Sequence, residues 1–240
     1  MRIFQKGFNY SQDGPGNRLV YHLQGCNLAC PWCANPEGLA IYGGTEYPVT
    51  ELVAEALRSR MMFFDGGGVT LTGGEVTMQL DEVKELLSEL HSLGIHTCIE
   101  TNGISSRLPE LFPFLDYLIM DIKHYDTDIH KAVTGIGNEE TIKNIKRALE
   151  QGKQLALRIP LIGGFNATCD DAKGFCVLFD FLGINENTTL ELLPYHEYGK
   201  DKYKSLGMEY KMTRSAFVSK ERLNEIKSIF SENGIKLIKT

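Results

Sequence analysis

Three cysteines, Cys26, Cys30 and Cys33, lie within eight residues of one another, with the spacing C-x3-C-x2-C. Thiolates bind soft metals, and a structural zinc ion normally takes four protein ligands. No fourth cysteine follows nearby, so a zinc site would need His22 or His96 as its fourth ligand. Three thiolates suit a [4Fe–4S] cluster that leaves one iron free to bind a substrate or cofactor. Three buried cysteines without a ligand account poorly for so tight a group, so the spacing predicts an iron–sulfur cluster.

The composition excludes several classes of protein. The chain has 240 residues, of which 42% are hydrophobic and 23% are charged, as in ordinary globular proteins. Its formal net charge of -6 offers no positive field to a nucleic-acid backbone. No apolar run reaches the ~18 residues that span a bilayer, and the first residues lack the apolar core of a secretory signal. We therefore expect a cytoplasmic protein that binds neither nucleic acid nor membrane.

The other cysteines, Cys98, Cys169 and Cys176, form no tight set and are expected to be small buried side chains.

From Arg18 onward, apolar runs typical of buried strands alternate with segments of helical period. The expected strands are Leu19–Leu23, Val69–Leu71, Thr97–Glu100, Tyr117–Asp121, Leu155–Pro160 and Thr189–Leu193. The expected helices are Thr50–Arg60, Asp81–Leu93, Glu139–Gln151, Asp170–Leu182 and Lys220–Asn233, followed by a terminal strand at Lys236–Ile238. Six such units are too few to close the usual eight-stranded barrel, so the pattern predicts an α/β fold with an incomplete (β/α)6 barrel. Ligands of such sheets bind at the carboxyl ends of the strands.

Glycines and charged residues follow the expected strands at that edge. Gly73-Gly74-Glu75 comes after the second strand, where a glycine pair alone is explained by a strand-to-helix turn. Asp121-Ile122-Lys123 ends the fourth strand and, taken alone, is as typical of a solvated sheet edge. Arg158 lies inside an apolar strand, where an unpaired charge would be costly, so we expect it to have a carboxylate partner. His196 follows the sixth strand and would either contact a ligand or pack as a hydrogen-bonded residue.

The cysteine loop resembles the signature of the radical S-adenosylmethionine (SAM) superfamily, in which an aromatic residue precedes the last cysteine. Trp32 fills that place here. A GGE loop after the second strand is a further motif of the superfamily, and Gly73-Gly74-Glu75 matches it. This resemblance implies a single radical SAM domain over residues 1–240, folded as a partial TIM barrel.

Further motifs resemble those of the glycyl-radical-enzyme activating enzymes, and the pyruvate formate-lyase activating enzymes in particular. They are Asp13-Gly14-Pro15-Gly16 with Arg18, Gly66-Gly67-Gly68-Val69-Thr70, Glu100-Thr101-Asn102-Gly103, Asp121-Ile122-Lys123 and Glu191-Leu192-Leu193-Pro194-Tyr195-His196-Glu197. Three positions depart from the family pattern, since Glu100 replaces a frequent Asp, Val76 a frequent Pro and Ala34 a frequent His. No cysteine lies between Cys33 and Gly73, so the ferredoxin-like insert of many activating enzymes is absent and one cluster is expected.

The resemblance implies roles for the residues at the strand ends. Cys26, Cys30 and Cys33 would be the catalytic cysteines that hold the cluster. SAM contacts are implied for Trp32, Cys33, Ala34, Gly73, Gly74, Glu75, Asp121, Lys123, Arg158 and His196. For Glu75 there are two alternatives, because its carboxylate would either accept from the SAM amine or hold its own loop. A monovalent cation, Na⁺ or K⁺, is implied beside the SAM carboxylate, with oxygen ligands from Glu100, Thr101, Asp121 and the carbonyl of Ile119. The longer side chain of Glu100 would shift that cation site or remove it.

The function implied is that of an activating enzyme. SAM would be cleaved reductively, and the 5′-deoxyadenosyl radical would abstract a hydrogen from a backbone glycine of a partner glycyl radical enzyme. A flavodoxin or a ferredoxin-type protein would supply the electron, and the activating enzyme is expected to be a monomer. Two alternatives are a radical SAM enzyme acting on a small molecule or another peptide, and an iron–sulfur protein without SAM chemistry.

Two segments are expected to contact a bound peptide from either side. They are the Asp13–Gly16 loop and the segment after His196. The seven cations between Gly199 and Arg222 form either a solvated surface or a docking site.

Overall fold

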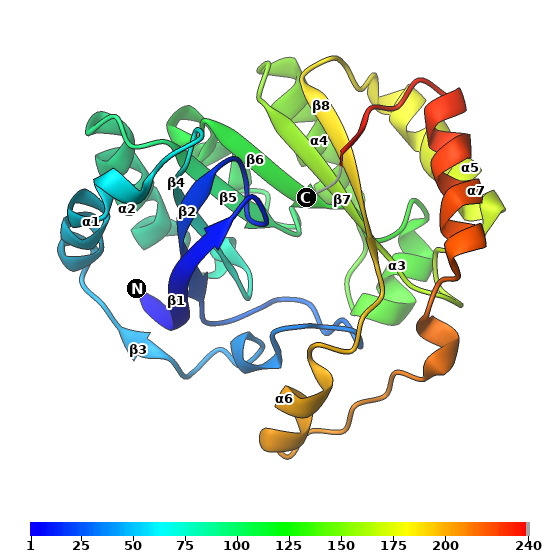
Figure 1. The fold of residues 1–240 in the computed structure, drawn as a ribbon, viewed down its shortest axis with the longest axis horizontal. Helices are drawn as coiled ribbons and strands as arrows, with labels where there is room; N and C mark the ends of the chain where they lie inside the picture. Colours follow the sequence, from blue (N-terminus) through cyan, green and yellow to red (C-terminus); the bar gives the residue numbers. More distant parts are fainter. Residues whose placement is uncertain (239–240) are drawn as a thin grey trace.

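The strand ends are positioned by one sheet, which has nine strands within residues 1–238, the part of the chain that the computed structural model describes. The strands are β1 (Arg2–Tyr10), β2 (Asn17–Leu23), β3 (Thr45–Glu46), β4 (Gly68–Gly73), β5 (Thr97–Thr101), β6 (Tyr117–Asp121), β7 (Leu155–Leu161), β8 (Thr188–Pro194) and β9 (Leu237–Ile238). Their order is β3-β1-β2-β4-β5-β6-β7-β8-β9. Neighbours from β2 to β9 are parallel, whereas β1 is antiparallel to both β2 and β3. The sheet curves but does not close, so β3 and β9 are its two edges (Figure 1).

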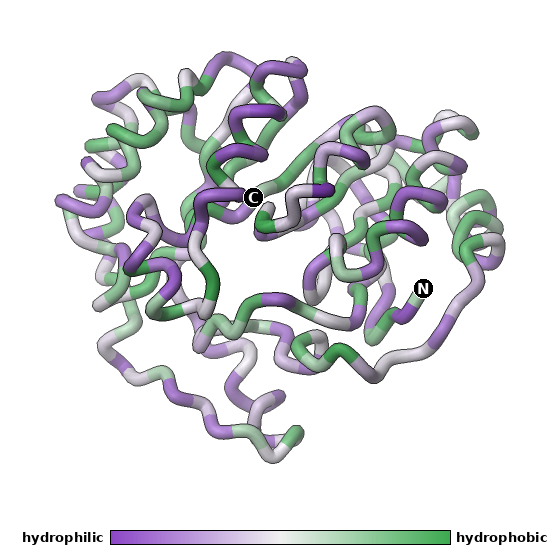
Figure 2. The backbone as a smooth tube through the Cα atoms, turned by 180° about the vertical axis from the view of Figure 1, so that it is seen from behind, coloured by the Kyte–Doolittle hydropathy of each residue, from purple (hydrophilic) through white to green (hydrophobic). Residues whose placement is uncertain are grey.

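Helices pack on the outer face of this sheet, except α6, which lies beside the loop that follows the cysteines (Figure 1). They are α1 (Val49–Arg58), α2 (Leu80–Ser92), α3 (Thr127–Thr134), α4 (Glu139–Glu150), α5 (Cys169–Leu182), α6 (Lys200–Ser205) and α7 (Lys220–Glu232). Short 3₁₀ helices are η1 (Pro36–Gly38), η2 (Arg60–Met62), η3 (Val76–Gln79), η4 (Leu108–Glu110), η5 (Phe112–Phe114) and η6 (Arg214–Ala216). The helices alternate between hydrophobic and hydrophilic residues along their length (Figure 2), as helices with one buried face must. Among residues 1–238, none of the helices has the length and apolar character of a membrane-spanning segment.

The incomplete barrel predicted from the sequence is confirmed, and its six predicted strands correspond to β2 and β4 to β8. The five predicted helices correspond to α1, α2, α4, α5 and α7, and the terminal strand to β9. These elements were predictable because each has its own apolar pattern. β1 was not predicted, since only one of its nine residues, Ile3, is buried. Its pairing with β2 makes it a strand.

A buried arginine holds the turn between β1 and β2 against the barrel. The guanidinium of Arg18 donates to the hydroxyl of Thr70 at 2.6 Å and to the carbonyls of Pro15 at 3.0 Å and Val69 at 2.8 Å. No ion pair to a carboxylate is formed by Arg18 within residues 1–238, and burial lowers its pKa. Gly16 in this turn has φ 66°, and a Cβ there would collide with the carbonyl of Phe64. The turn is therefore fixed by the hydrogen bonds of Arg18 and by the close approach of Gly16 to the main chain of Phe64.

Replacing Arg18 by Met should lower the free energy of unfolding by about 3 kcal/mol, because several buried carbonyls lose their donor. Urea unfolding followed by circular dichroism measures this change. Arg107→Met is the matched control, since Arg107 pairs with Asp81 and Glu110 on the surface and should change stability little. Equal losses in the two variants would contradict the assignment.

Candidate active site

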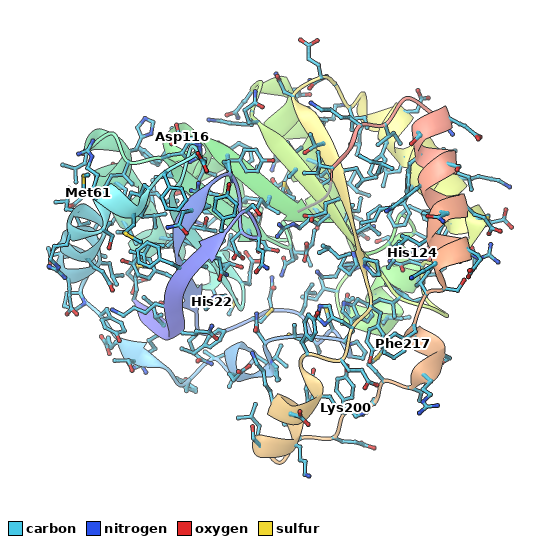
Figure 3. The ribbon with its side chains drawn as sticks, in the orientation of Figure 1. His22, Met61, Asp116, His124, Lys200 and Phe217 are labelled. Carbon is cyan, nitrogen blue, oxygen red and sulfur yellow. The ribbon has the colours of Figure 1, made fainter. Side chains whose placement is uncertain are left out.

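A pocket of ≈ 650 Å³ collects most of the residues singled out from the sequence. Its lining includes Cys26, Cys30, Trp32, Cys33, Ala34, Gly73, Gly74, Glu100, Thr101, Asp121, Lys123, Arg158 and His196. Glu75 and Ile119 are buried and do not line it. Gly73, Glu100, Thr101 and Asp121 come from the carboxyl ends of their strands, where a ligand of an open α/β barrel is expected, whereas Arg158 lies in the middle of β7. The segment after β8, which carries Lys200 and Phe217 in Figure 3, lies on the same side of the sheet as the cysteine loop.

The cysteine loop is held in place from several directions. It begins directly after β2, where the N–H of Gly25 donates to the carbonyl of Gly38 at 2.9 Å. The N–H of Ala29 donates to the last residue of α3, Thr134, at 3.0 Å. On the outer side Gly199 packs against the carbonyl of Cys33, where a Cβ would not fit. These contacts fix the shape of the loop.

The three thiols of this loop are free and face the same pocket. Burial raises the pKa of Cys26, Cys30 and Cys33 to about 11, so a cation is needed to hold them as thiolates. Within residues 1–238, no three cysteine, histidine or acidic side chains converge on one point as ligands of a single ion would. A cluster spreads its thiolates over separate irons, so it requires a wider triangle than zinc does. The three thiols suit a cluster by their number, their chemistry and the pocket that they share.

The two candidate fourth ligands for zinc lie in different places. His22 lines the pocket, and its buried Nδ1 has no hydrogen-bond partner within residues 1–238. His96 lies beside Arg18, whose guanidinium nitrogens are 3.3 Å from its Nδ1. Since Arg18 lies near the start of β2 and the cysteine loop follows the end of that strand, His96 is at the opposite end of the barrel.

The glycine pair after β4 lets two main chains meet closely. A Cβ on Gly74 would collide with the carbonyl of Gly25, and Gly73 has φ 111°. The N–H of Gly74 donates to Leu23 at 2.8 Å, and that of Glu75 donates to Gly25 at 2.7 Å. The glycines therefore join the end of β4 to the start of the cysteine loop.

The carboxylate of Glu75 is occupied by protein donors. One oxygen accepts from the N–H of Thr77 at 3.0 Å and from the hydroxyls of Thr77 and Thr101, both at 2.7 Å. The other accepts from the N–H of Asn102 at 2.9 Å. Of the two alternatives for Glu75, its hydrogen bonds are those of a residue that holds the loops after β4 and β5.

A lysine and an aspartate at the end of β6 form a buried ion pair in the pocket wall. The Nζ of Lys123 lies 2.5 Å from one oxygen of Asp121. Burial alone would lower the pKa of Lys123, but the charge and hydrogen bond of Asp121, together with the nearby Cys30 and Cys26, outweigh burial and raise that pKa. The second oxygen of Asp121 is buried and has no hydrogen-bond partner within residues 1–238. An unpartnered buried carboxylate oxygen in a pocket is suited to accept from a ligand hydroxyl or amine.

Arg158 has the carboxylate partner predicted for it, and in fact has two. Its guanidinium lies 2.8 Å from Glu100 on β5 and 2.7 Å from Glu191 on β8. It also donates to the carbonyl of Gln12 in the turn between β1 and β2. Burial opposes the charge of Arg158, but the two carboxylates outweigh burial and raise its pKa.

The monovalent cation suggested by the resemblance finds no support in this geometry. Glu100 is bonded to Arg158 and, at 3.1 Å, to the hydroxyl of Thr72. The hydroxyl of Thr101 donates to Glu75, and Ile119 is packed in a buried cluster with Cys98 and Ala156.

Aromatic rings line part of the pocket. His196 stacks on Tyr198 with ring centroids 4.0 Å apart, and burial lowers its pKa, which favours the neutral ring. Trp32 packs against Phe165 at 4.9 Å. Tyr198, Gln12 and His22 were not among the predicted cofactor-binding residues although they line the pocket. Gln12 and Tyr198 carry a signal in the sequence, because Gln12 directly precedes the Asp13–Gly16 motif and Tyr198 closely follows the last motif.

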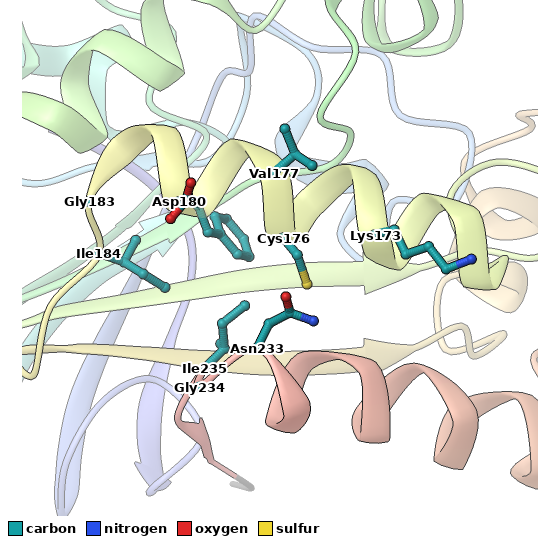
Figure 4. Close-up of a pocket in the computed structure, with 10 residues that line it drawn as sticks. Lys173, Cys176, Val177, Asp180, Gly183, Ile184, Asn233, Gly234 and Ile235 are labelled. Atoms are coloured by element: carbon teal, nitrogen blue, oxygen red, sulfur yellow. The ribbon is translucent and has the colours of Figure 1, made fainter.

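The remaining cysteines are not part of this pocket. Cys98 and Cys176 are buried, as expected, but Cys169 is only half-buried. Its sulfur lies 2.8 Å from the guanidinium of Arg222, where α5 meets α7, so the expectation of a buried side chain was wrong for Cys169. A separate pocket of ≈ 460 Å³ lies between these two helices and is lined by Cys176 and Asp180 (Figure 4).

The sequence matches the Radical SAM superfamily over residues 20–172. The chain belongs to the radical SAM superfamily. It is also related to activating enzymes of glycyl radical enzymes, being 32% identical over 231 residues to the pyruvate formate-lyase 1-activating enzyme of Escherichia coli. That alignment covers 94% of this chain and 93% of the relative. Membership of the superfamily implies a [4Fe–4S] cluster and SAM.

A second relative is the 4-hydroxyphenylacetate decarboxylase activating enzyme of Clostridioides difficile, 30% identical, with 93% of this chain and 90% of the relative covered. The alignment extends over 289 positions, more than the 240 residues of this chain, so this relative contains residues that the chain lacks.

Solved structures share the fold. A domain of a pyruvate-formate lyase-activating enzyme from Bacteroides vulgatus is 26% identical with a TM-score of 0.58, covering 72% of this chain and 98% of that one. A radical SAM methyltransferase from Sphaerobacter thermophilus has a TM-score of 0.67 at 19% identity, covering 97% of this chain and 72% of that one. The second likeness concerns the fold alone.

Glu75→Gln should lower the free energy of unfolding by about 1–3 kcal/mol, because the new amide turns a donor toward the N–H of Asn102. Urea unfolding of the protein without cofactors gives this value. Glu85→Gln on the exposed face of α2 is the matched control and should be close to wild type. Unchanged stability in Glu75→Gln would show that these hydrogen bonds do not hold the loops.

Proposed function

We propose that this protein is an activating enzyme that installs a radical on a backbone glycine of a partner glycyl radical enzyme. The observation that carries the proposal is the shared pocket. It brings the three free thiols together with an unpartnered oxygen of Asp121, beside main chain exposed by Gly73 and Gly74. The relationship to two activating enzymes along nearly the full chain supports the same reaction.

In this proposal Cys26, Cys30 and Cys33 hold one [4Fe–4S] cluster, with SAM in the rest of the pocket. When bound, the cluster and SAM together supply a 5′-deoxyadenosyl radical that takes the hydrogen from the glycine. The protein residues bind and orient SAM, and they exclude water from the pocket. The role assigned to Asp121 is to accept a hydrogen bond from SAM, while Lys123 fixes that carboxylate and offers its charge to the SAM carboxylate.

Other pocket residues orient the cofactor from its remaining sides. Gly73 and Gly74 allow the SAM methionyl group to approach the main chain closely. The neutral ring of His196, stacked on Tyr198, presents a flat face for the adenine. Trp32 and Ala34 lie beside the cysteines, and Arg158 keeps Glu100 in the wall of the pocket.

The proposal carries further expectations. The chain acts as a single domain over residues 1–240 and as a monomer in the cytoplasm under anaerobic conditions. A flavodoxin or ferredoxin-type protein delivers the electron, and the partner glycyl radical enzyme is the protein substrate. The alternative is a radical SAM enzyme that acts on a small molecule or on another peptide.

The testing experiment uses anaerobically reconstituted protein with SAM, a reductant and a glycyl radical enzyme encoded beside its gene. Electron paramagnetic resonance should detect a glycyl doublet that depends on SAM. 5′-Deoxyadenosine without a doublet would favour the alternative substrate. If a protein with a complete cluster forms neither the glycyl doublet nor 5′-deoxyadenosine, this result would contradict radical SAM chemistry.

Replacing any one of the three loop cysteines by Ala should remove the intact cluster and reduce SAM cleavage to background, because each supplies a thiolate that no other residue replaces. Iron and sulfide content and 5′-deoxyadenosine formation measure these losses. Cys176→Ala, outside the pocket, is the control and should keep both. A loop variant with a full cluster and full activity would refute the ligand assignment.

Lys123→Ala should weaken SAM binding by about tenfold to a hundredfold while the iron content stays near wild type, because one charged hydrogen bond is lost. Titration calorimetry with SAM gives the affinity. Lys84→Ala, which removes a surface ion pair with Glu110, serves as the control. Equal loss of SAM binding and of iron would mean that Lys123 supports the fold instead.

A further inference from the structure

One edge of β1 is left open next to the pocket. β1 pairs with β2 from Ile3 to Tyr10, but on its other side it meets β3 only at Arg2 and Ile3. The N–H of Ser11 donates to the carbonyl of Gly16 at 2.9 Å, which continues the same register. Since hydrogen-bonded pairs alternate in an antiparallel ladder, the main-chain groups of Lys6, Phe8 and Tyr10 point away from β2. These outward groups have no main-chain partner within residues 1–238.

This edge lacks the usual protection against pairing. Proteins blunt free edges with prolines, charged side chains, covering loops or short strands. The one charged side chain between Gln5 and Tyr10, Lys6, is paired with Glu55 of α1 at 2.8 Å. From Gln5 to Tyr10 the edge of β1 has no proline, and the side chains of Phe8 and Tyr10 are 42% and 55% exposed. The bulge near Ile3 lies at the end already covered by β3. A long open edge with exposed aromatic residues is suited to receive another strand.

A glycine in the middle of β1 supports this interpretation. Gly7 does not have a left-handed φ, and a Cβ there would meet nothing within 4 Å. Neither conformation nor crowding within the described chain therefore requires glycine. A glycine inside a strand is often a place where another backbone comes close. The alternation of side chains puts Gly7 on the same face as Asn9, which lines the pocket.

The open edge borders the unclosed side of the barrel. Asn9 of β1 lines the pocket together with Leu193 and Pro194 at the end of β8. β1 and β8 stand on opposite sides of the unclosed part of the sheet (Figure 1). A strand added to β1 would run along this side, next to the pocket.

We propose that the partner's glycine-bearing segment docks on β1 as an added strand, hydrogen-bonded to the outward main-chain groups of Lys6, Phe8 and Tyr10. The inference rests on the proposed function, whose target is a main-chain carbon without a side chain. A side-chain pocket cannot identify glycine by contact, whereas strand addition fixes the position of a backbone independently of its side chains. Alternate residues of the docked segment then face the pocket.

Amide hydrogen exchange measured by NMR on the cluster-loaded diamagnetic protein tests the docking directly. With the partner enzyme present, exchange at Lys6, Phe8 and Tyr10 should slow about tenfold or more. The amides of Gln5, Gly7 and Asn9 already pair with β2 and should change little. Unchanged exchange at the three outward amides while the partner is bound would overturn the proposal. Their protection in the protein alone, through pairing of two copies, would overturn it as well.

A pair of variants separates the main chain from the side chain. Phe8→Pro removes an outward N–H and leaves the ladder to β2, because proline is tolerated where the N–H faces away from a partner strand. Phe8→Val removes the ring but keeps the N–H. Phe8→Pro should raise the KM for the partner about tenfold above that of Phe8→Val, while both retain partner-independent SAM cleavage.

Equal KM values for the two variants would count against strand addition. A glycyl doublet with wild-type protein but unprotected outward amides would remove the docking inference and leave the proposed function intact. If wild-type protein cleaves SAM but forms no glycyl doublet, both the docking inference and the proposed function would be wrong.

Discussion

The guanidinium of Arg158 ties together the parts of the barrel on which the pocket depends. It stands on β7, binds Glu100 on β5 and Glu191 on β8, and donates to the carbonyl of Gln12. Buried ion pairs often add little net stability, because removing charges from water is costly. Their value here is positional, since one rigid planar group sets the spacing of three strands and one turn. The sheet can then stay open on one side and still have a defined interior.

This constraint separates the residues that shape the pocket from those free to bind a ligand. Arg158, Glu100 and Glu75 have their polar atoms bonded to protein groups. One oxygen of Asp121 has no such partner in the described chain, and the three thiols form no disulfide and face the same space. Of these thiols, that of Cys26 accepts only a long hydrogen bond, 3.5 Å, from the N–H of Leu28. A rigid frame with a few unpartnered groups is the arrangement expected of a preorganised binding site.

Much of the fold could be predicted because parallel strands buried on both faces have continuous apolar runs. β1 could not, because its identity as a strand comes from pairing with β2 and only Ile3 is buried. The residues of the pocket could be predicted where spacing and motif act together, as in the cysteine loop. The bonding of Glu75 could not, since a carboxylate after two glycines has the same sequence whether it binds a ligand or four protein donors. The half-buried position of Cys169 could not be predicted either, because it depends on where α7 packs.

The most direct measurement follows a deuterium from the partner's glycine. A partner glycyl radical enzyme labelled with α-deuterated glycine would be incubated anaerobically with this protein, SAM and a reductant, and the 5′-deoxyadenosine analysed by mass spectrometry. We expect the 5′-deoxyadenosine to gain one deuterium from the labelled partner and none from an unlabelled partner. 5′-Deoxyadenosine that forms without deuterium, while the labelled partner stays free of radical, would contradict the proposed function.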